Sequence, residues 1–222
     1  MSKGCIGPEG AKDIANGLEV NAVLTSLDLS FNNLAGETGY INSTEVEGDS
    51  KEEGAKVVYQ GREMTVIKGI DEDGELRMAD FSGVLALANA LKVNAAMTKI
   101  VLSYNEIKDE GAIALGKALK INKSLNELQL VDCGIGTEGG KALASALSEG
   151  SAVMTTLNLS DNALCGLRYG QGTYDASGIK ALASALEVNR VLTSLNVGLT
   201  NLNSPAGALF RDPGTPSVAP PG

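Results

Sequence analysis

The sequence predicts an α/β fold, a stacked solenoid in which short parallel strands alternate with helices. The six residues ALASAL occur at 142–147 and return letter for letter at 181–186. A strand-like phrase and a helix-like phrase also recur five times each along the chain. The 222 residues, 43% apolar and 20% charged, are enough for one large domain with a continuous core.

The strand phrase reads L-x-x-L-x-L-x-x-[N/C/T]-x-[L/I], and its copies start at residues 24, 97, 125, 154 and 192. Leu128 and Leu130 alternate with a polar residue, which is the period of a strand with one buried face. We therefore expect five strands that pair in parallel and in sequence order. Their expected centres are Leu27–Leu29, Ile100–Leu102, Leu128–Leu130, Leu157–Leu159 and Leu195–Val197.

The helix phrase precedes each strand phrase. Leu143 and Leu147 lie one helical turn apart, and the alanines between them let the helix approach whatever it covers. The phrase predicts helices over 9–19, 82–93, 109–121, 137–148 and 177–188. A strand and a helix repeated in this way bury their apolar faces only against neighbouring copies, so the units must stack.

This unit resembles the leucine-rich repeat of the ribonuclease-inhibitor-like class, whose long repeats carry a full helix and whose ninth strand-phrase position alternates between Asn and Cys. In this chain that position holds Asn32, Asn105, Cys133, Asn162 and Thr200. The resemblance implies a horseshoe arc, with a short parallel sheet on the concave side and helices on the convex side. It also implies that these five side chains form a turn ladder, bonded to the backbone of their own and the adjacent coil. It implies little about function.

Two units carry extra chain, because successive phrase starts differ by 73, 28, 29 and 38 residues. The first insertion, 36–79, reads as a flexible polar link over 36–55 followed by a β-hairpin or three-stranded meander with turns at 60–61 and 71–74. The second, 166–175, reads as a loop kept mobile by glycine. We expect residues 1–210 to form one solenoid and 211–222 a proline-rich tail that is extended or disordered.

Composition excludes several classes of function. Eighteen basic against 27 acidic residues give a net charge of -9, which disfavours nucleic acid and anionic membranes as partners. The absence of histidine excludes His-based catalysis and His-ligated metals. The offsets in 71–76 match only part of a calcium loop, so a hairpin turn is favoured there. No catalytic residue, metal site or cofactor is predicted.

The expected location is intracellular and cytoplasmic. The N-terminal residues lack the pattern of a signal peptide, and no apolar run is long enough to span a membrane. The three cysteines lie far apart and indicate free thiols in a reducing compartment. The first unit is a helix half without its strand, so we expect a partner or a neighbouring subunit of a larger assembly to cover an uncapped end.

These observations favour a non-enzymatic protein-interaction module or scaffold subunit. The alternative is a regulator of a small GTPase, because the GTPase-activating proteins for the nuclear-transport GTPase are similar acidic repeat proteins of this class. None of that family's functional residues can be placed on this sequence.

Two surfaces are candidates for binding a protein partner. Both insertions enter after the turn and before the helix of their unit, so we expect them on one edge, about 15 Å apart at the sheet. This edge would present Tyr59, Arg62, Met64, Arg168, Tyr169 and Tyr174, residue types common in hot spots. The alternative is that the insertions are tolerated surface decoration.

The second candidate is the concave face, through Asp28, Lys99, Glu127, Gln129, Asn158 and Asn196. Phe31 and Tyr104 lie at the strand ends, so no aromatic stripe marks this face. Its side chains are also what the solvated side of a half-exposed sheet would carry.

Overall fold

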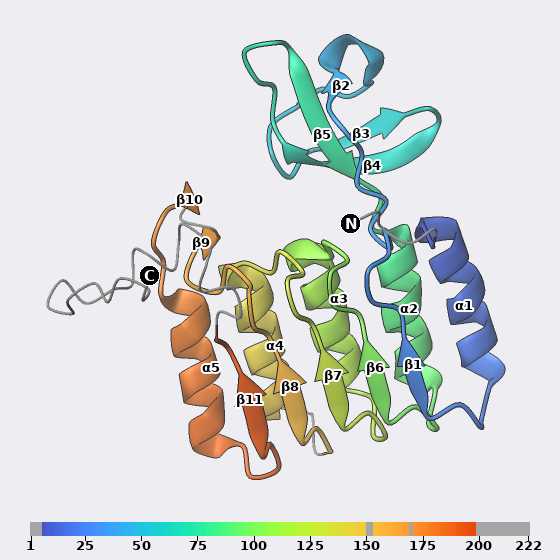
Figure 1. Cartoon of the computed structure of the whole chain (residues 1–222), viewed down its shortest axis with the longest axis vertical. Helices are drawn as coiled ribbons and strands as arrows, with labels where there is room; N and C mark the ends of the chain where they lie inside the picture. The colour runs from blue at the N-terminus through green and yellow to red at the C-terminus, as the bar shows by residue number, and fades with distance from the viewer. Residues whose placement is uncertain (1–5, 150–152, 169–170, 199–222) are drawn as a thin grey trace, which may run out of the picture.

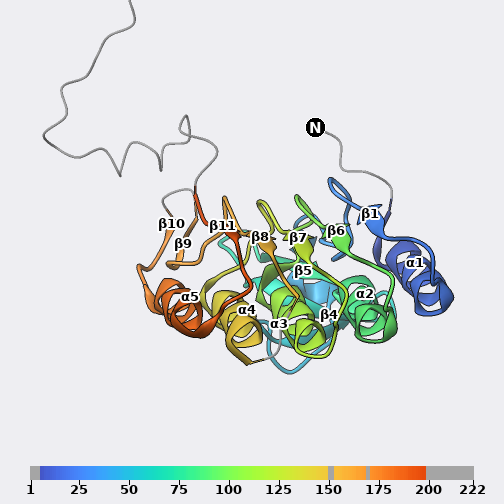
Figure 2. The ribbon, with the colours of Figure 1, turned by 90° about the horizontal axis from the view of Figure 1, so that it is seen from below.

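The structure, a computed structural model, describes residues 6–149, 153–168 and 171–198. Its main body has two layers, a row of helices packed against one face of a sheet of short strands (Figures 1 and 2). The helices are α1 (Pro8–Val20), α2 (Ser82–Val93), α3 (Lys108–Leu119), α4 (Thr137–Glu149) and α5 (Ser177–Val188). The predicted helices are confirmed, with α3 ending at Leu119 instead of residue 121.

The main sheet contains β1 (Ser26–Asp28), β6 (Lys99–Val101), β7 (Glu127–Gln129), β8 (Thr156–Asn158) and β11 (Ser194–Asn196). The strands pair in parallel in the order β1-β6-β7-β8-β11, which confirms the predicted topology. Equivalent apolar residues lie side by side, with Leu128 between Ile100 and Leu157. Each strand is centred one residue before the predicted centre.

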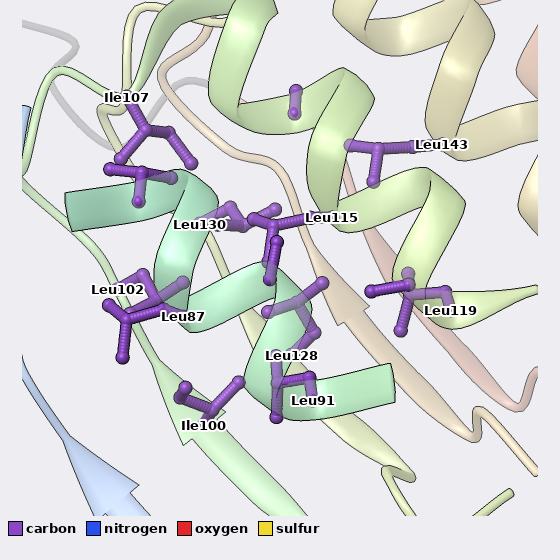
Figure 3. Packing of buried hydrophobic residues seen from close by; sticks show 14 of the residues in the cluster. Leu87, Leu91, Ile100, Leu102, Ile107, Leu115, Leu119, Leu128, Leu130 and Leu143 are labelled. Carbon is purple, nitrogen blue, oxygen red and sulfur yellow. The ribbon is translucent and has the colours of Figure 1, made fainter. Parts of the chain in front are cut away.

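Leucines from helices and strands fill the space between the two layers. Figure 3 shows Leu87 and Leu115 of α2 and α3 lying over Leu102 and Leu130. Leu128, Leu130, Leu143 and Leu147 are all buried, as predicted. Burial falls at the ends of the sheet: Leu24, beside β1, is 40% exposed, whereas its counterpart Leu125 is 1% exposed.

A glycine near the start of α2, α3, α4 and α5 lets neighbouring helices approach closely. A Cβ added to Gly83 of α2 would lie 2.7 Å from the Cα of Pro8 in α1. A Cβ added to Gly139 of α4 would lie 2.8 Å from the Cβ of Ala112 in α3. Real Cβ atoms do not approach that closely, so an alanine at either position would push two helices apart.

The side chains at the turn position bond the backbone of adjacent units. The Nδ2 of Asn105 donates to Leu29 O of the previous unit and to Leu102 O of its own, at 2.8 and 3.0 Å. The Nδ2 of Asn162 donates to Leu130 O at 2.7 Å, and its Oδ1 accepts from Cys133 N at 3.0 Å. Asn32 and Cys133 bond nearby carbonyls in the same way, and Thr200 lies outside the described residues. The turn ladder is thus present through four of its five predicted positions.

A second ladder of asparagines, absent from the sequence analysis, lies at the opposite ends of the helices. The Nδ2 of Asn122 donates to Leu91 O at 2.6 Å, a carbonyl near the C-terminus of α2, and to Asn94 O at 2.9 Å. Its Oδ1 accepts from the N–H groups of Ser124 and Leu125. Asn94 makes the same four bonds one unit earlier. This helix-end ladder satisfies carbonyls that have no partner within their own helix.

The first insertion folds as a small antiparallel sheet of its own. Its strands are β2 (Ile41–Asn42), β3 (Lys56–Tyr59), β4 (Arg62–Lys68) and β5 (Glu75–Ala79), in the order β2-β5-β4-β3. The predicted meander is confirmed over β3 to β5. The prediction of a flexible link over 36–55 is wrong, because β2 pairs with β5 and Glu47 bridges to Val58. We call this unit the insertion sheet.

The second insertion contains a short hairpin in place of the predicted mobile loop. Strands β9 (Leu167–Arg168) and β10 (Gln171–Gly172) pair in antiparallel fashion. After it, Asp175 Oδ1 accepts from Ser177 N at 2.8 Å where α5 begins, as Asp80 does from Ser82 N for α2. The two aspartates lie at equivalent positions before their helices, so the two insertions end alike.

Replacing Leu128 by Ala should lower the free energy of unfolding by about 2–5 kcal/mol, because it leaves a cavity in the packed core. Leu85 on α2 is 42% exposed, and Leu85→Ala should cost about 1 kcal/mol or less. Urea denaturation of both variants measures the difference. Equal losses would contradict the assignment of Leu128 to the core.

Replacing Asn162 by Ala should lower the free energy of unfolding by about 1–3 kcal/mol, because it leaves backbone groups of two units without partners. Thermal and urea denaturation measure the loss. Asn89, exposed on α2, is the control, and Asn89→Ala should change stability by about 0.5 kcal/mol or less. If Asn162→Ala melted like the control, the turn ladder would not support the fold.

Candidate interaction surface

The concave face, the side of the main sheet away from the helices, carries polar side chains that bind one another. Lys99 Nζ lies 2.7 Å from Glu127 Oε1, and Gln129 Nε2 donates to the same oxygen over 3.2 Å. The bond from Lys99 holds the pKa of the Glu127 carboxyl below its ordinary value. These three predicted residues therefore form one group across β6 and β7.

The other predicted residues of this face bond their own strand ends. Asp28 Oδ1 accepts from the hydroxyl and the N–H of Ser30, at 2.6 and 2.9 Å, and both bonds lower the pKa of Asp28. Asn158 accepts from the same two groups of Ser160, and Asn196 accepts from Gly198 N. These acceptors thus stabilise the turns that follow the strands.

A row of four side chains follows β1, β6, β7 and β8, each three residues after its strand ends. Phe31, Tyr104, Asp132 and Asp161 all have left-handed backbones, with φ of 57°, 62°, 49° and 59°. Each amide donates to the next unit, as from Phe31 N to Ser103 O and from Tyr104 N to Val131 O. We call these four residues the strand-end row.

The strand-end row joins an aromatic pair to an acidic pair. The rings of Phe31 and Tyr104 are stacked, with centroids 4.2 Å apart and planes 12° apart. Phe31 is 47% exposed. Burial is the main cause that raises the pKa of Tyr104, and the carboxylates of Asp161 and Asp132 raise it further. This pair was not predicted, because 73 residues separate its members in the sequence.

The insertion sheet places its predicted contact residues differently. Arg62 is exposed, and Tyr59 is half-buried against the small core of the insertion sheet. Met64 is 5% exposed within that core, so its prediction as a contact residue is not supported by its position.

One exposed group on the insertion sheet was not predicted. Tyr40 is 48% exposed, and Lys68 Nζ lies 2.7 Å from its hydroxyl and 4.7 Å from its ring centroid. Arg77 lies 5.7 Å from the same ring and pairs with Glu37 at 2.6 Å. Lys68 and Arg77 are paired across β4 and β5, so register and not sequence spacing brings the two cations to one tyrosine.

The second insertion presents Tyr174, which is 68% exposed. Arg168 lies in β9, and Tyr169 lies outside the described residues. Figure 1 shows the insertion sheet above α2 and the β9–β10 hairpin above α5, both at the upper edge of the solenoid. The strand-end row follows the strands toward the same edge.

The one buried thiol of the described chain is unreactive at neutral pH. Burial raises the pKa of Cys133 to about 12, and its Sγ donates to Leu102 O. Within residues 6–149, 153–168 and 171–198, no group of three or more acidic or cysteine side chains is placed to hold a metal ion. None of the described helices is long and apolar enough to cross a membrane.

Comparison with known proteins agrees with the observed units. A model of the leucine-rich repeat matches residues 20–37, 93–116 and 122–144. The matched segments contain β1, β6 with most of α3, and β7 with half of α4. The chain is a leucine-rich-repeat protein. The ladder of Asn and Cys and the full helices of these leucine-rich repeats are consistent with the ribonuclease-inhibitor-like class.

One solved structure shares the fold of this chain over most of its length. The C-terminal domain of tropomodulin from Caenorhabditis elegans is similar over 90% of this chain and 92% of its own, with a TM-score of 0.50 and 14% identity. The actin-binding site 2 of leiomodin-1 is similar over 57% of this chain and 67% of its own, with a TM-score of 0.44 and 21% identity. No curated protein sequence matches the chain.

Alkaline pH should destabilise the protein in part through Cys133. The folded-state pKa of about 12 is raised above the ordinary value of 9.0, so the neutral thiol is favoured on folding. This contribution is complete below pH 9 and is lost as pH rises toward 12, at about 1 kcal/mol for each pH unit. Urea denaturation at pH 8, 9, 10 and 11 measures the slope.

Cys133→Ser is the matched variant, because a hydroxyl donates as the thiol does and does not titrate in this range. The other titrating groups are common to both proteins, so the difference between the two slopes isolates the thiol. Identical slopes between pH 9 and 11 would show that Cys133 is not a buried neutral thiol.

Proposed function

We propose that this protein is a non-enzymatic interaction module that binds a protein partner along the edge where the strands of the main sheet end. The observation that carries the proposal is the shared position of three features at this edge: the insertion sheet, the β9–β10 hairpin and the strand-end row (Figure 1). In this proposal, the two insertions and the strand-end row belong to one solenoid that covers residues 1–210.

The residue types at this edge support the proposal. Tyr40, Phe31 and Tyr174 are each about half exposed or more, in a chain with only eight aromatic residues. Exposed aromatic side chains held on a rigid scaffold supply large contact areas at small entropic cost. The concave face offers less, since Lys99 and Glu127 already pair with each other.

The free thiols of Cys133 and Cys165 support an intracellular and cytoplasmic location for this interaction. Binding of such a partner would cover the exposed side chains of this edge and involves no chemical step. The proposed function therefore requires neither catalytic residues nor a cofactor. If the partner is a small GTPase, its rate of GTP hydrolysis is measured with and without this protein. A changed rate would indicate regulation, and an unchanged rate would indicate binding alone.

Single substitutions at the edge should weaken partner binding about tenfold or more, because each removes a large exposed contact side chain. The partner is first captured with the parent protein and identified by mass spectrometry. Its affinity is then measured for Tyr174→Ala and Arg62→Ala, and for Lys99→Ala and Gln129→Ala as the concave controls. Loss of binding only in the concave variants would refute the edge assignment.

A further inference from the structure

The strand-end row combines two kinds of recognition chemistry within four successive units. Phe31 and Tyr104 form a stacked aromatic platform that is open to solvent at Phe31. Asp132 and Asp161 continue the row on the Tyr104 side, and both carboxylates act on the Tyr104 phenol. Because neighbouring strands lie about 5 Å apart, the whole row spans about 15 Å, the length of four or five extended residues.

The backbone holds these four side chains in fixed positions. The left-handed conformation is uncommon for non-glycine residues, and aspartate tolerates it better than phenylalanine or tyrosine does. The amide of each row residue donates to a carbonyl of the next unit, from Asp132 N to Ser160 O at 3.1 Å and from Asp161 N to Gly198 O at 3.0 Å. A ligand therefore meets a row that is already organised, which lowers the entropic cost of binding.

The charge and shape of the row indicate what it binds. Negative carboxylates beside aromatic rings attract a guanidinium or an ammonium, which pairs with the carboxylates and lies against the ring faces. The net charge of -9 favours approach of a cationic segment and disfavours an anionic one. The exposed ring of Phe31 offers an apolar contact at the other end of the row.

We propose that the strand-end row is the docking site for a basic segment of the protein partner, an extended stretch in which arginine alternates with apolar residues. This inference rests on the proposed function and names the chemistry of the partner. An arginine pairs with Asp132 and Asp161, and an apolar side chain packs on Phe31 and Tyr104. Arginine is preferred to lysine because its planar guanidinium both stacks and forms two parallel bonds to a carboxylate.

The test uses a fluorescently labelled six-residue peptide of alternating Leu and Arg, with anisotropy measured at physiological ionic strength. A second peptide with citrulline in place of Arg keeps the planar shape and three N–H donors but replaces the charged guanidinium by a neutral urea group. The parent protein should bind the arginine peptide at least tenfold more tightly than the citrulline peptide. Equal affinities, or no binding of the arginine peptide, would overturn the inference.

The site is then located with two double variants of equal charge. Asp132→Asn with Asp161→Asn removes the acidic pair, and asparagine suits the left-handed backbone at both positions. Asp13→Asn with Glu138→Gln removes two exposed carboxylates on α1 and α4. The first variant should weaken the arginine peptide about tenfold, and the second by less than about twofold. Equal weakening in both would mean binding to overall charge and would overturn the inference.

The aromatic end is tested by Phe31→Leu, which keeps an apolar side chain of similar volume but removes the ring. The arginine peptide should bind this variant about threefold more weakly, and circular dichroism should show an unchanged fold. If the captured partner lost affinity with Tyr174→Ala but not with the Asp132 and Asp161 double variant, the inference about the row would fail and the proposed function would stand.

Discussion

The hydrogen bonds that asparagine side chains make between adjacent units hold this solenoid together. A strand of three residues and a helix of three turns leave many backbone groups without partners in their own unit. Asn105 and Asn162 bond the turns that follow the strands, and Asn94 and Asn122 bond the carbonyls at the helix ends. Leucine packing drives the layers together, but these bonds fix the register in which one unit stacks on the next.

This stacking explains why the candidate surface lies at one edge. The turn ladder fixes the turn after each strand, so the third residue after the strand lies in a similar environment in four successive units. At that point four units carry left-handed residues whose amides are bonded to the following unit. The side chains there are not needed for the core. One unit carries Phe31 where another carries Asp161, so the surface differs between units while the fold of each unit stays the same. Insertions enter a few residues later, where the ladder has already been completed.

The repeat pattern was enough to predict the fold, because periodic leucines and alanines report burial directly. The five parallel strands and the helices follow from it, whereas the meander over β3 to β5 was predicted from the turn residues within the first insertion. The helix-end ladder was also present in the sequence, as the Asn that follows a Val or Ile at the end of four helix phrases. Its meaning depends on which backbone carbonyls the neighbouring helix leaves without a partner. The polar composition of 36–55 suggested a flexible link, whereas the pairing of β2 with β5 orders it. Pairing between distant segments leaves no local signal.

The surface was harder to predict than the fold, for the same reason. Met64 is of a residue type that is common at interfaces, but in β4 its side chain is buried in the small core of the insertion sheet. Phe31 and Tyr104 become one platform only because the first insertion is looped out between β1 and β6, so that residues 73 positions apart occupy successive units. A solenoid converts equivalent positions of the repeat into spatial neighbours. Functional residues in such a chain are therefore best sought by aligning its units and reading each position across them. At the third position after the strand, that reading gives two aromatic residues followed by two aspartates.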